Sequence, residues 1–336
     1  MKRIIFAICT ILCANVLSAQ EQLAVLKHND STSAFYGQSA FVQAYNAAAN
    51  GDVITLSNGI FSTPDYIRKG ITVRGNGAVA DTARRSTGTY FMERFTLSGL
   101  GDTLQFSAEG IYFADFCASY AYDIKLTRCY INAFCQNGGV QATNCVLYTG
   151  TSSNNNNLYG SSSRNNTYIN CILKARTHSG VGVSSYNYFP YYAICNNCII
   201  IGSYEVNSYP YQYNNCVVIK TGTLSDTILN GAVNYSVLIG FTGSNNPASS
   251  GNVAMSLSDV FENWDGETLS TDLETYVLKS SVSDSIQGLD ETEVGIFGGF
   301  MPFDWRPTYS VIKRCNVANR TTADGKLSVD IEVITE

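Results

Sequence analysis

The segment 174–178 carries the densest group of residues suited to chemistry. Lys174, Arg176 and His178 alternate with small residues, so an extended backbone would project all three from one side. A cationic side chain there would neutralise an acidic sugar while His178 or a tyrosine moves a proton, as in a polysaccharide lyase. The alternative is a solvated strand edge that ends in the Ser179-Gly180 turn.

Tyrosines gather in two successive segments, each of which leads into an Asn-Asn-Cys sequence. They are Tyr186, Tyr188, Tyr191 and Tyr192 in the first segment, and Tyr209, Tyr211 and Tyr213 in the second. Both segments have a proline between aromatic residues, so the two loops are expected to stack into an aromatic surface rimmed by phenolic hydroxyls. Such a surface suits sugar rings. The alternative is that these rings only cover the flank of the fold and pack on each other.

Carboxylates are scarce in the central region. Between Cys129 and Leu238 the only ones are Glu205 and Asp226, and no Asp-Asp pair or Gly-His-Gly motif accompanies them. A hydrolase needs two carboxylates that flank the scissile bond. These two are therefore either neighbours on successive coils or solvated loop residues, and the second reading is favoured.

Nine cysteines follow the leader segment, an odd number that leaves at least one thiol free in a monomer. They are Cys117, Cys129, Cys135, Cys145, Cys171, Cys195, Cys198, Cys216 and Cys315. Cys195 and Cys198 have the two-residue gap of a zinc or redox pair, but no second pair with that gap exists. We therefore predict no metal site and expect reduced thiols that point inward. One or two disulfides in an oxidising compartment are the alternative.

An Asn-Cys-aliphatic repeat predicts the elements that position these groups. Its six fits have Cys129, Cys145, Cys171, Cys198, Cys216 or Ser236 as the second residue, at intervals of 16, 26, 27, 18 and 20 residues. One coil of a parallel β-helix has about this length, and longer intervals place extra residues in loops. Asn tolerates a left-handed corner and can form ladders between coils, while Cys would point inward as a small apolar group.

The two ends of the repeat region are predicted to differ from its middle. Ser39 is expected to cap a helix from Phe41 to Ala48 that ends at Asn50-Gly51 and covers the first coil. The sequence thus predicts an all-β fold: one right-handed parallel β-helix (solenoid) over residues 20–307, with an N-terminal capping helix. Residues 308–336 form a tail, in which Lys326–Val333 alternates like a half-buried strand.

The first 19 residues have the features of a signal peptide. Lys2 and Arg3 precede an apolar run from Ile4 to Leu12, and cleavage is expected after Ala19. No later segment is long and apolar enough to span a membrane, so a secreted or outer-surface protein is expected. With 27 acidic against 21 basic residues, the chain has no broad basic field for nucleic acid.

Both ends of the repeat region resemble a known superfamily. Gly51-Asp-Val-Ile-Thr-Leu56 and Gly70-Ile-Thr-Val-Arg-Gly75 look like the opening coils of pectate-lyase-like right-handed β-helix proteins. The segment from Glu293 to Gly299 resembles the closing part of exported β-helix proteins of Gram-negative bacteria. The resemblance covers residues 39–307 and implies the fold, whereas a polysaccharide or glycan partner is expected from the tyrosine-rich segments. It does not by itself imply an activity, because one fold hosts unrelated functions.

Three functions follow as expectations. The first is glycan binding through the tyrosine-rich loops, without catalysis and without a cofactor. The alternative is a lyase acting on a uronate-containing polymer through Lys174, Arg176 and His178; relatives of that kind often use calcium, although calcium-binding carboxylates are not visible beside these residues. A second alternative is a structural or adhesive surface protein with a protein partner.

Overall fold

The structure is predominantly β, and most of its strands lie in two long sheets. It is a computed structural model that describes residues 22–82, 86–135, 139–149, 163–174, 190, 192–202, 211–221, 232–241, 251–266, 268–306, 311–317, 324–325 and 329–334. The leader segment 1–19 lies outside these residues, so export stays a prediction. No helix in the described part of the chain is long and apolar enough to cross a membrane.

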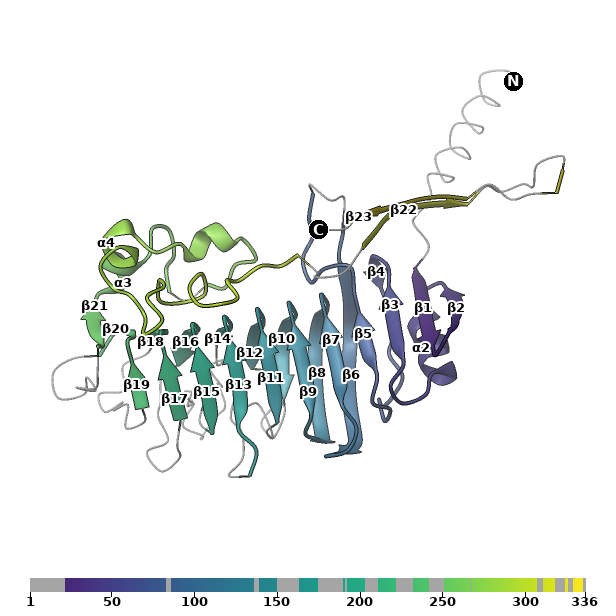
Figure 1. Cartoon of the computed structure of the whole chain (residues 1–336), viewed down its shortest axis with the longest axis horizontal. Helices are drawn as coiled ribbons and strands as arrows, with labels where there is room; N and C mark the ends of the chain where they lie inside the picture. The colour runs from purple at the N-terminus through teal and green to yellow at the C-terminus, as the bar shows by residue number, and fades with distance from the viewer. Residues whose placement is uncertain are drawn as a thin grey trace, which may run out of the picture.

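From β3 to β20 the chain alternates between the two sheets and gives one strand to each in turn. Sheet A has eleven strands in the order β19-β17-β15-β13-β11-β9-β7-β5-β3-β1-β2, and sheet B has ten in the order β21-β20-β18-β16-β14-β12-β10-β8-β6-β4. Neighbouring strands are parallel except at β1, which pairs antiparallel with β2 and β3. One strand from each sheet makes a coil, and the coils stack along the long axis of the molecule (Figure 1). This confirms the predicted β fold and is compatible with a parallel β-helix.

The strands are short, as expected for coils of this length. Those of sheet A are β1 (Leu23–His28), β2 (Ser31–Tyr36), β3 (Val53–Leu56), β5 (Thr72–Arg74), β7 (Phe106–Glu109), β9 (Ile124–Thr127), β11 (Val140–Thr143), β13 (Asn166–Ile169), β15 (Ala193–Asn196), β17 (Tyr211–Asn214) and β19 (Ala232–Asn234). Those of sheet B are β4 (Gly59–Ile60), β6 (Thr89–Gly101), β8 (Tyr112–Ala121), β10 (Tyr130–Cys135), β12 (Val146–Thr149), β14 (Ile172–Lys174), β16 (Ile199–Gly202), β18 (Val217–Lys220), β20 (Val237–Ile239) and β21 (Val253–Met255).

Each fit of the repeat forms the corner between a strand of sheet A and the next strand of sheet B. The first residue of every fit has a left-handed backbone, with φ values of 52°, 53°, 48°, 51°, 55° and 49° from Arg128 to Tyr235. Asn tolerates this conformation better than most residues, which explains its use at four of the six corners. The second residue points inward, and all six are fully buried. The predicted left-handed corner and the predicted inward position after it are both confirmed.

The buried cysteines do more than fill space, which the sequence did not predict. At each corner the backbone N–H of the second residue donates to the side chain of its counterpart in the next coil. Cys145 N donates to Cys171 Sγ at 3.5 Å, and Cys171 N donates to Cys198 Sγ at 3.4 Å. Cys216 N donates to Ser236 Oγ at 3.0 Å, and the series ends where Ser236 N donates to Asn252 Oδ1 at 3.1 Å. A small side chain with an acceptor atom is thus needed to satisfy a buried N–H group.

The corner asparagines do not form the ladder predicted for them. At the C-terminal coils, side-chain amides one residue earlier, on sheet A, bond to one another instead. Asn214 Nδ2 donates to Asn196 Oδ1 at 2.9 Å, and Asn234 Nδ2 donates to Asn214 Oδ1 at 3.0 Å. The corner side chains instead contact residues near the C-terminus, because the left-handed backbone turns them away from the neighbouring corner and toward that segment.

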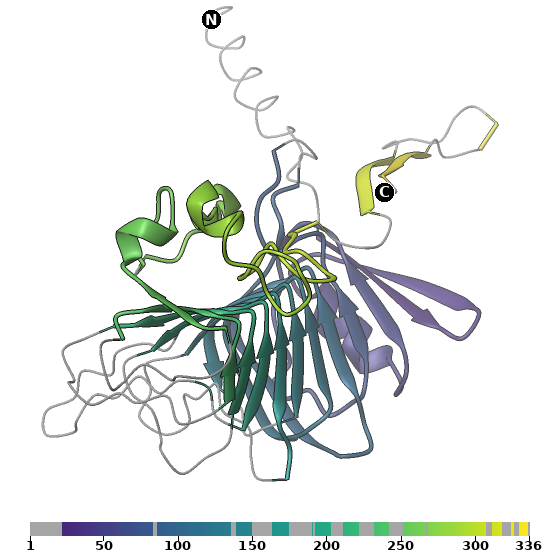
Figure 2. The ribbon, with the colours of Figure 1, turned by 60° about the vertical axis from the view of Figure 1, so that its left-hand side comes forward.

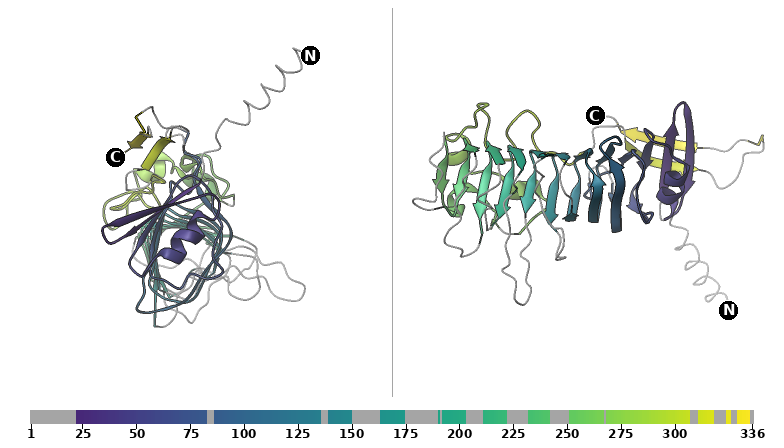
Figure 3. Two further views of the ribbon diagram at one scale, coloured as in Figure 1. Left: turned by 90° about the vertical axis from the view of Figure 1, so that its right-hand side faces the viewer. Right: turned by 90° about the horizontal axis from the view of Figure 1, so that it is seen from below.

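A short helix and a stack of phenylalanines form the N-terminal end of the core. Helix α2 (Ala40–Ala47) begins after Ser39, as predicted, although Ser39 makes no capping hydrogen bond through its side chain. Phe41 of α2 packs edge-on against Phe91 with ring centroids 4.9 Å apart, and Phe95 stacks on Phe116 at 5.8 Å. Seen along the stack, α2 lies across the end of the first coil (Figure 3). The β1–β2 hairpin before it was not predicted.

The segment after β21 turns back along the stack (Figures 1 and 2). We call residues 257–306 the strap; it contains α3 (Leu257–Val260), the 3-10 helix η2 (Leu273–Tyr276) and α4 (Ser280–Ser283). Its buried residues, among them Trp264, Tyr276 and Ile296, form a second apolar core against the outer side of sheet B. After the strap, β22 (Val311–Val317) and β23 (Val329–Ile334) pair antiparallel in a small sheet of their own, which places a strand where the tail was predicted to have one.

The strap crosses the corners in reverse order. Leu289 N donates to Asn215 Oδ1 at 2.8 Å, Asn170 Nδ2 donates to Ile296 O at 2.8 Å, and Asn144 Nδ2 donates to Pro302 O at 3.2 Å. At Gly299, where φ is +75°, a Cβ atom would lie only 2.8 Å from Asn197 Oδ1. Glycine is therefore required where the strap passes this corner. The corner side chains thus fix the position of the strap.

Candidate functional site

The outer side of sheet B carries one continuous row of side chains, which we call the outer row. Each member is the register partner of the next, and the row comprises Ile60, Tyr90, Tyr112, Tyr130, Val146, Ile172, Ile199, Val217, Val237 and Val253. The strap covers the aliphatic members from Val146 to Val237, all of which are buried in its core. The members from Ile60 to Tyr130 lie beyond that core except where Tyr130 packs at its border. The change from aliphatic to aromatic residues thus coincides with the end of the strap.

The rings of the three tyrosines, which we call the tyrosine row, contact one another in sequence. Ring centroids of Tyr90 and Tyr112 are 5.5 Å apart with the rings tilted by 54°, whereas Tyr112 and Tyr130 stack at 5.4 Å with an interplanar angle of 22°. Trp305 at the end of the strap continues the stack, 6.3 Å from Tyr130. All four rings are half-buried, and Ile60 beside Tyr90 is 47% exposed. The three tyrosines and Trp305 form an aromatic strip that crosses β6, β8 and β10 and ends at the strap.

Each ring of the tyrosine row contacts a neighbouring ring and is half-buried, so part of each side chain is open to solvent. Burial, and to a lesser degree the neighbouring Tyr112, raises the pKa of Tyr90 above its usual value. A neutral phenol can both donate and accept a hydrogen bond. The strip therefore offers hydrogen-bonding groups set in an apolar surface, with Ile60 and the 53% exposed Met92 extending that surface beyond Tyr90.

Polar and ionisable groups lie on the same side of β6, β8 and β10. Arg94 Nε is 2.7 Å from Asp115 Oδ2, and the pKa of Arg94 is raised because Asp115 accepts this hydrogen bond. Further along the same strands, the thiols of Cys117 and Cys135 are in contact, with sulfurs 3.5 Å apart. The uncovered part of sheet B thus combines an aromatic strip, an ion pair and a thiol pair on adjacent strands.

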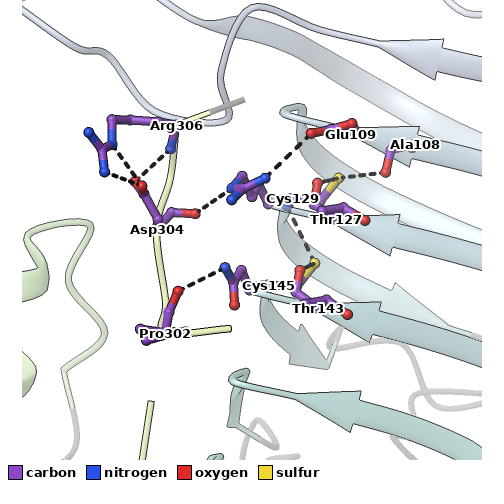
Figure 4. A network of polar contacts seen from close by, with 11 residues as sticks. Ala108, Glu109, Thr127, Cys129, Thr143, Cys145, Pro302, Asp304 and Arg306 are labelled. Atoms are coloured by element: carbon purple, nitrogen blue, oxygen red, sulfur yellow. Dashed lines mark hydrogen bonds and ion pairs between the residues drawn. The ribbon is translucent and has the colours of Figure 1, made fainter. Parts of the chain in front are cut away.

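A second charged cluster lies at the corner beneath the end of the strap, and its role is structural. Arg128 Nε donates to Asp304 O at 3.1 Å and its guanidinium lies 3.6 Å from Glu109, while Asp304 pairs with Arg306 at 2.6 Å (Figure 4). Burial raises the pKa of Asp304, but hydrogen bonds from Arg306 outweigh this and lower it overall. These contacts hold the strap to the corner, so the cluster is part of its attachment.

Of the predicted catalytic residues, only Lys174 lies within the described structure. It ends β14 on the outer side of sheet B, with its Nζ atom 5.8 Å from the centroid of the Tyr148 ring. Arg176 and His178 lie outside the described residues, as do Glu205 and Asp226, so the proposed convergence of these groups stays a prediction.

Two of the predicted sugar-binding tyrosines are core residues. Tyr211 and Tyr213 belong to β17 and point inward with 7% and 0% exposure, and the Tyr213 hydroxyl donates to Pro190 O. Strand alternation places both on the buried side, so they are not available to a ligand at the surface. Tyr192 is half-buried at a corner with φ of 47°. Tyr186, Tyr188, Tyr191 and Tyr209 lie outside the described residues.

Among the described residues, no group of three or more His, Cys, Asp or Glu side chains is placed to hold a metal ion. Calcium prefers several oxygen ligands, and the described carboxylates do not supply such a set. Cys195 and Cys198 are both fully buried, and burial raises the pKa of both thiols, which disfavours the thiolate that zinc requires.

The sequence contained a signal for the tyrosine row that the search for Asn-Cys pairs missed. In the repeat, Tyr130 is the residue after Cys129, and the same place holds Tyr112 after Gly110-Ile111 and Tyr90 after Gly88-Thr89. Glycine occupies the left-handed corner in these two coils, with φ of 65° and 86°. Extending the repeat upstream with Gly in place of Asn would have aligned the three tyrosines.

Comparisons of the chain with protein-family models, with curated proteins and with solved structures found no match.

Proposed function

We propose that this protein is an exported, pectate-lyase-like right-handed β-helix that binds a polysaccharide along the aromatic strip formed by the tyrosine row and Trp305. The observation that carries the proposal is the outer row of sheet B, which is aliphatic where the strap covers it and aromatic where the strap ends. An aromatic residue with a hydroxyl group is suited to a surface that must be both apolar and hydrogen-bonding.

A glycan fits this strip better than a purely apolar partner. Sugar hydroxyls can exchange hydrogen bonds with phenolic groups, while the C–H faces of a sugar ring can pack on Ile60, Met92 and Tyr90. The repeat of the coils sets neighbouring tyrosines 5.4 to 5.5 Å apart, so an extended chain along the stack would meet the same groups at each coil. Arg94, held by Asp115, gives a polar flank.

Affinity electrophoresis in gels containing neutral or uronate-rich polysaccharides tests this binding. Tyr112→Ala should weaken retardation about tenfold, which corresponds to roughly 1.4 kcal/mol. Tyr112→Phe keeps the ring but removes the hydroxyl, so comparing it with Tyr112→Ala separates the contribution of the hydroxyl from that of the ring. Tyr36→Ala is the matched control, because Tyr36 is 58% exposed but lies on the β1–β2 hairpin, away from the strip. Equal retardation of the wild type and Tyr112→Ala on every retarding polymer would contradict the proposal.

A polysaccharide lyase is the second candidate, and Lys174 favours it. Lys174 lies on the outer side of sheet B, two strands beyond Tyr130 along the same sheet, where an acidic sugar bound near the strip would meet a cation. Incubation with uronate-containing polymers should then raise the ultraviolet absorbance of unsaturated sugar ends, and Lys174→Ala should abolish the rise. Binding without any such rise supports the first function over the second.

A further inference from the structure

Cys117 and Cys135 differ from the other cysteines in where they lie. Of the eight cysteines whose side chains the structure describes, six are buried and these two are half-buried. Cys117 lies on β8 between the buried residues Phe116 and Ala118, and Cys135 ends β10 after the buried Phe134. Strand alternation therefore turns both thiols outward, to the side of sheet B that carries the aromatic strip.

The two thiols are matched by the register of the sheet. Cys117 and Cys135 are direct partners in the parallel pairing of β8 with β10, and their sulfurs are 3.5 Å apart. Adjacent strands lie about 4.8 Å apart, which is within the Cα separation that disulfides span. Bond formation requires the sulfurs to approach by roughly 1.5 Å, to the usual length of about 2.05 Å.

Three groups around the pair decide its ionisation. The contact with Cys135 lowers the pKa of Cys117 to about 7 and outweighs burial, which raises this pKa. The Arg94 guanidinium on β6 also lowers it, and the Asp115 carboxylate on β8 raises it. The pKa of Cys135 on β10 is raised, chiefly because its proton is shared with Cys117. One thiol of the pair is therefore a thiolate near neutral pH while the other keeps its proton. In contrast, burial raises the pKa of Cys129, Cys145 and Cys171 well above the usual value.

We propose that Cys117 and Cys135 form a redox-active pair that undergoes thiol–disulfide exchange with a disulfide-bearing oxidant and closes into a cross-strand disulfide between two coils. The Cys117 thiolate attacks one sulfur of the oxidant, whose S–S bond breaks and releases one thiolate, which takes up a proton. Cys135 then loses its proton to solvent and attacks the Cys117 sulfur of the mixed disulfide, which releases the second thiol. The pair gives up two electrons and the oxidant is reduced to two thiols.

The nucleophile in exchange is a thiolate, and the second sulfur of the pair is adjacent to resolve the mixed disulfide. We assign the first role to Cys117 and the second to Cys135. Both residues are half-buried, unlike the six cysteines of the core. The pair does not include the tyrosine row, and it shares with the proposed glycan surface only Arg94 and its partner Asp115.

Peptide mapping by mass spectrometry of the folded full chain tests the pair. After incubation with oxidised glutathione, a peptide pair linked through Cys117 and Cys135 should appear, lighter by two hydrogens than the free thiols, and dithiothreitol should reverse it. In Cys135→Ser, Cys117 should accumulate as a glutathione adduct, because no resolving thiol remains. In Cys117→Ser, adduct formation at Cys135 should be slow. Native alkylation of the reduced wild type should label these two cysteines before the six buried ones.

Two further variants test whether the neighbouring charges activate the Cys117 thiol or whether this thiol reacts only because it is exposed. Arg94→Gln removes the cation and should lower the alkylation rate of Cys117 at pH 7 about fivefold if its pKa rises by one unit. Asp115→Asn removes the opposing charge and should leave the rate equal or higher. The proposal is overturned if no link between Cys117 and Cys135 forms in the folded protein, or if both thiols alkylate no faster than the buried cysteines.

Discussion

The side-chain amide of Asn170 donates a hydrogen bond of 2.8 Å to the backbone carbonyl of Ile296, 126 residues further along the chain. It donates a second one of 2.7 Å to Gly298 O. One corner of the repeat thus holds the strap in place, and the strap decides which part of the outer row is covered. The first prediction tests this connection.

Asn170→Ala should destabilise the protein by about 1–3 kcal/mol, because two carbonyl groups of the strap lose their donor. Alanine also suits the φ of 48° poorly. Asn170→Gly is the matched control, since it loses the same hydrogen bonds but accepts the backbone conformation, and the difference between the two variants isolates the backbone cost. Denaturant unfolding gives both values, and hydrogen exchange at 294–300 should accelerate in both variants. Unchanged exchange there would show that Asn170 does not hold the strap.

Cys171→Ser should cost less than about 1 kcal/mol, whereas Cys171→Ala should cost about 1–3 kcal/mol. Serine keeps an acceptor for Cys145 N, as Ser236 does for Cys216 N in the wild type, while alanine leaves a buried N–H group without a partner. Thermal unfolding of the two variants measures the difference. If alanine is tolerated as well as serine, the acceptor role of the thiol is wrong and the residue serves only as a small apolar group.

Tyr276 joins η2 to the second core, and its two functions can be separated. Its ring packs edge-on against Trp264 at 4.9 Å, and its hydroxyl accepts from Ser270 N at 2.7 Å and donates to Ser270 O at 2.9 Å. Tyr276→Ala should cost about 3–5 kcal/mol through loss of packing. Tyr276→Phe should cost about 1–2 kcal/mol through loss of these two hydrogen bonds alone. Denaturant midpoints check the ranking, and equal losses would show that packing on Trp264 contributes little.

Burial also raises the pKa of Tyr276 to about 12. A group with a raised folded pKa stabilises fully below its unfolded pKa, near 10, and that stability is lost as pH rises toward 12. The alkaline loss of stability between pH 10 and 12 should therefore be smaller in Tyr276→Phe than in the wild type. Thermal unfolding across this range measures it, and parallel curves for the two proteins would argue against the shift.

Asp52 connects the β1–β2 hairpin to the end of α2. His28 Nδ1 lies 2.8 Å from Asp52 Oδ1, and Ala49 N donates to Asp52 Oδ2 at 2.6 Å. Burial raises the pKa of Asp52, but the Ala49 and His28 contacts outweigh it and lower the pKa overall. Its stabilising contribution is therefore present above the unfolded pKa, near 3.9, and is lost at lower pH. Asp52→Asn should melt earlier than the wild type at pH 6 and approach it below pH 4.

The order of the residues was enough to find the corners and the buried cysteines. A left-handed corner restricts the residue to Asn or another tolerant type, and the inward position after it requires a small side chain, so both leave a regular pattern along the chain. The same local rule, extended to Gly110-Ile111-Tyr112, also identifies the strand starts of the N-terminal coils. These features depend only on backbone conformation and alternation over three or four residues.

The candidate site could not be read in the same way, because it depends on contacts between distant segments. Whether an outer-row residue such as Val217 or Tyr112 meets solvent is decided by where the strap runs, and no local pattern encodes its path. The tyrosines before Asn-Asn-Cys were expected at the surface, yet alternation within β17 buries Tyr211 and Tyr213. The contact of Cys117 with Cys135 needs the register of β8 with β10, which only the folded sheet sets. The sequence by itself determined the coil, and the tertiary structure decided which of its faces remained open, since burial is a property of the whole chain.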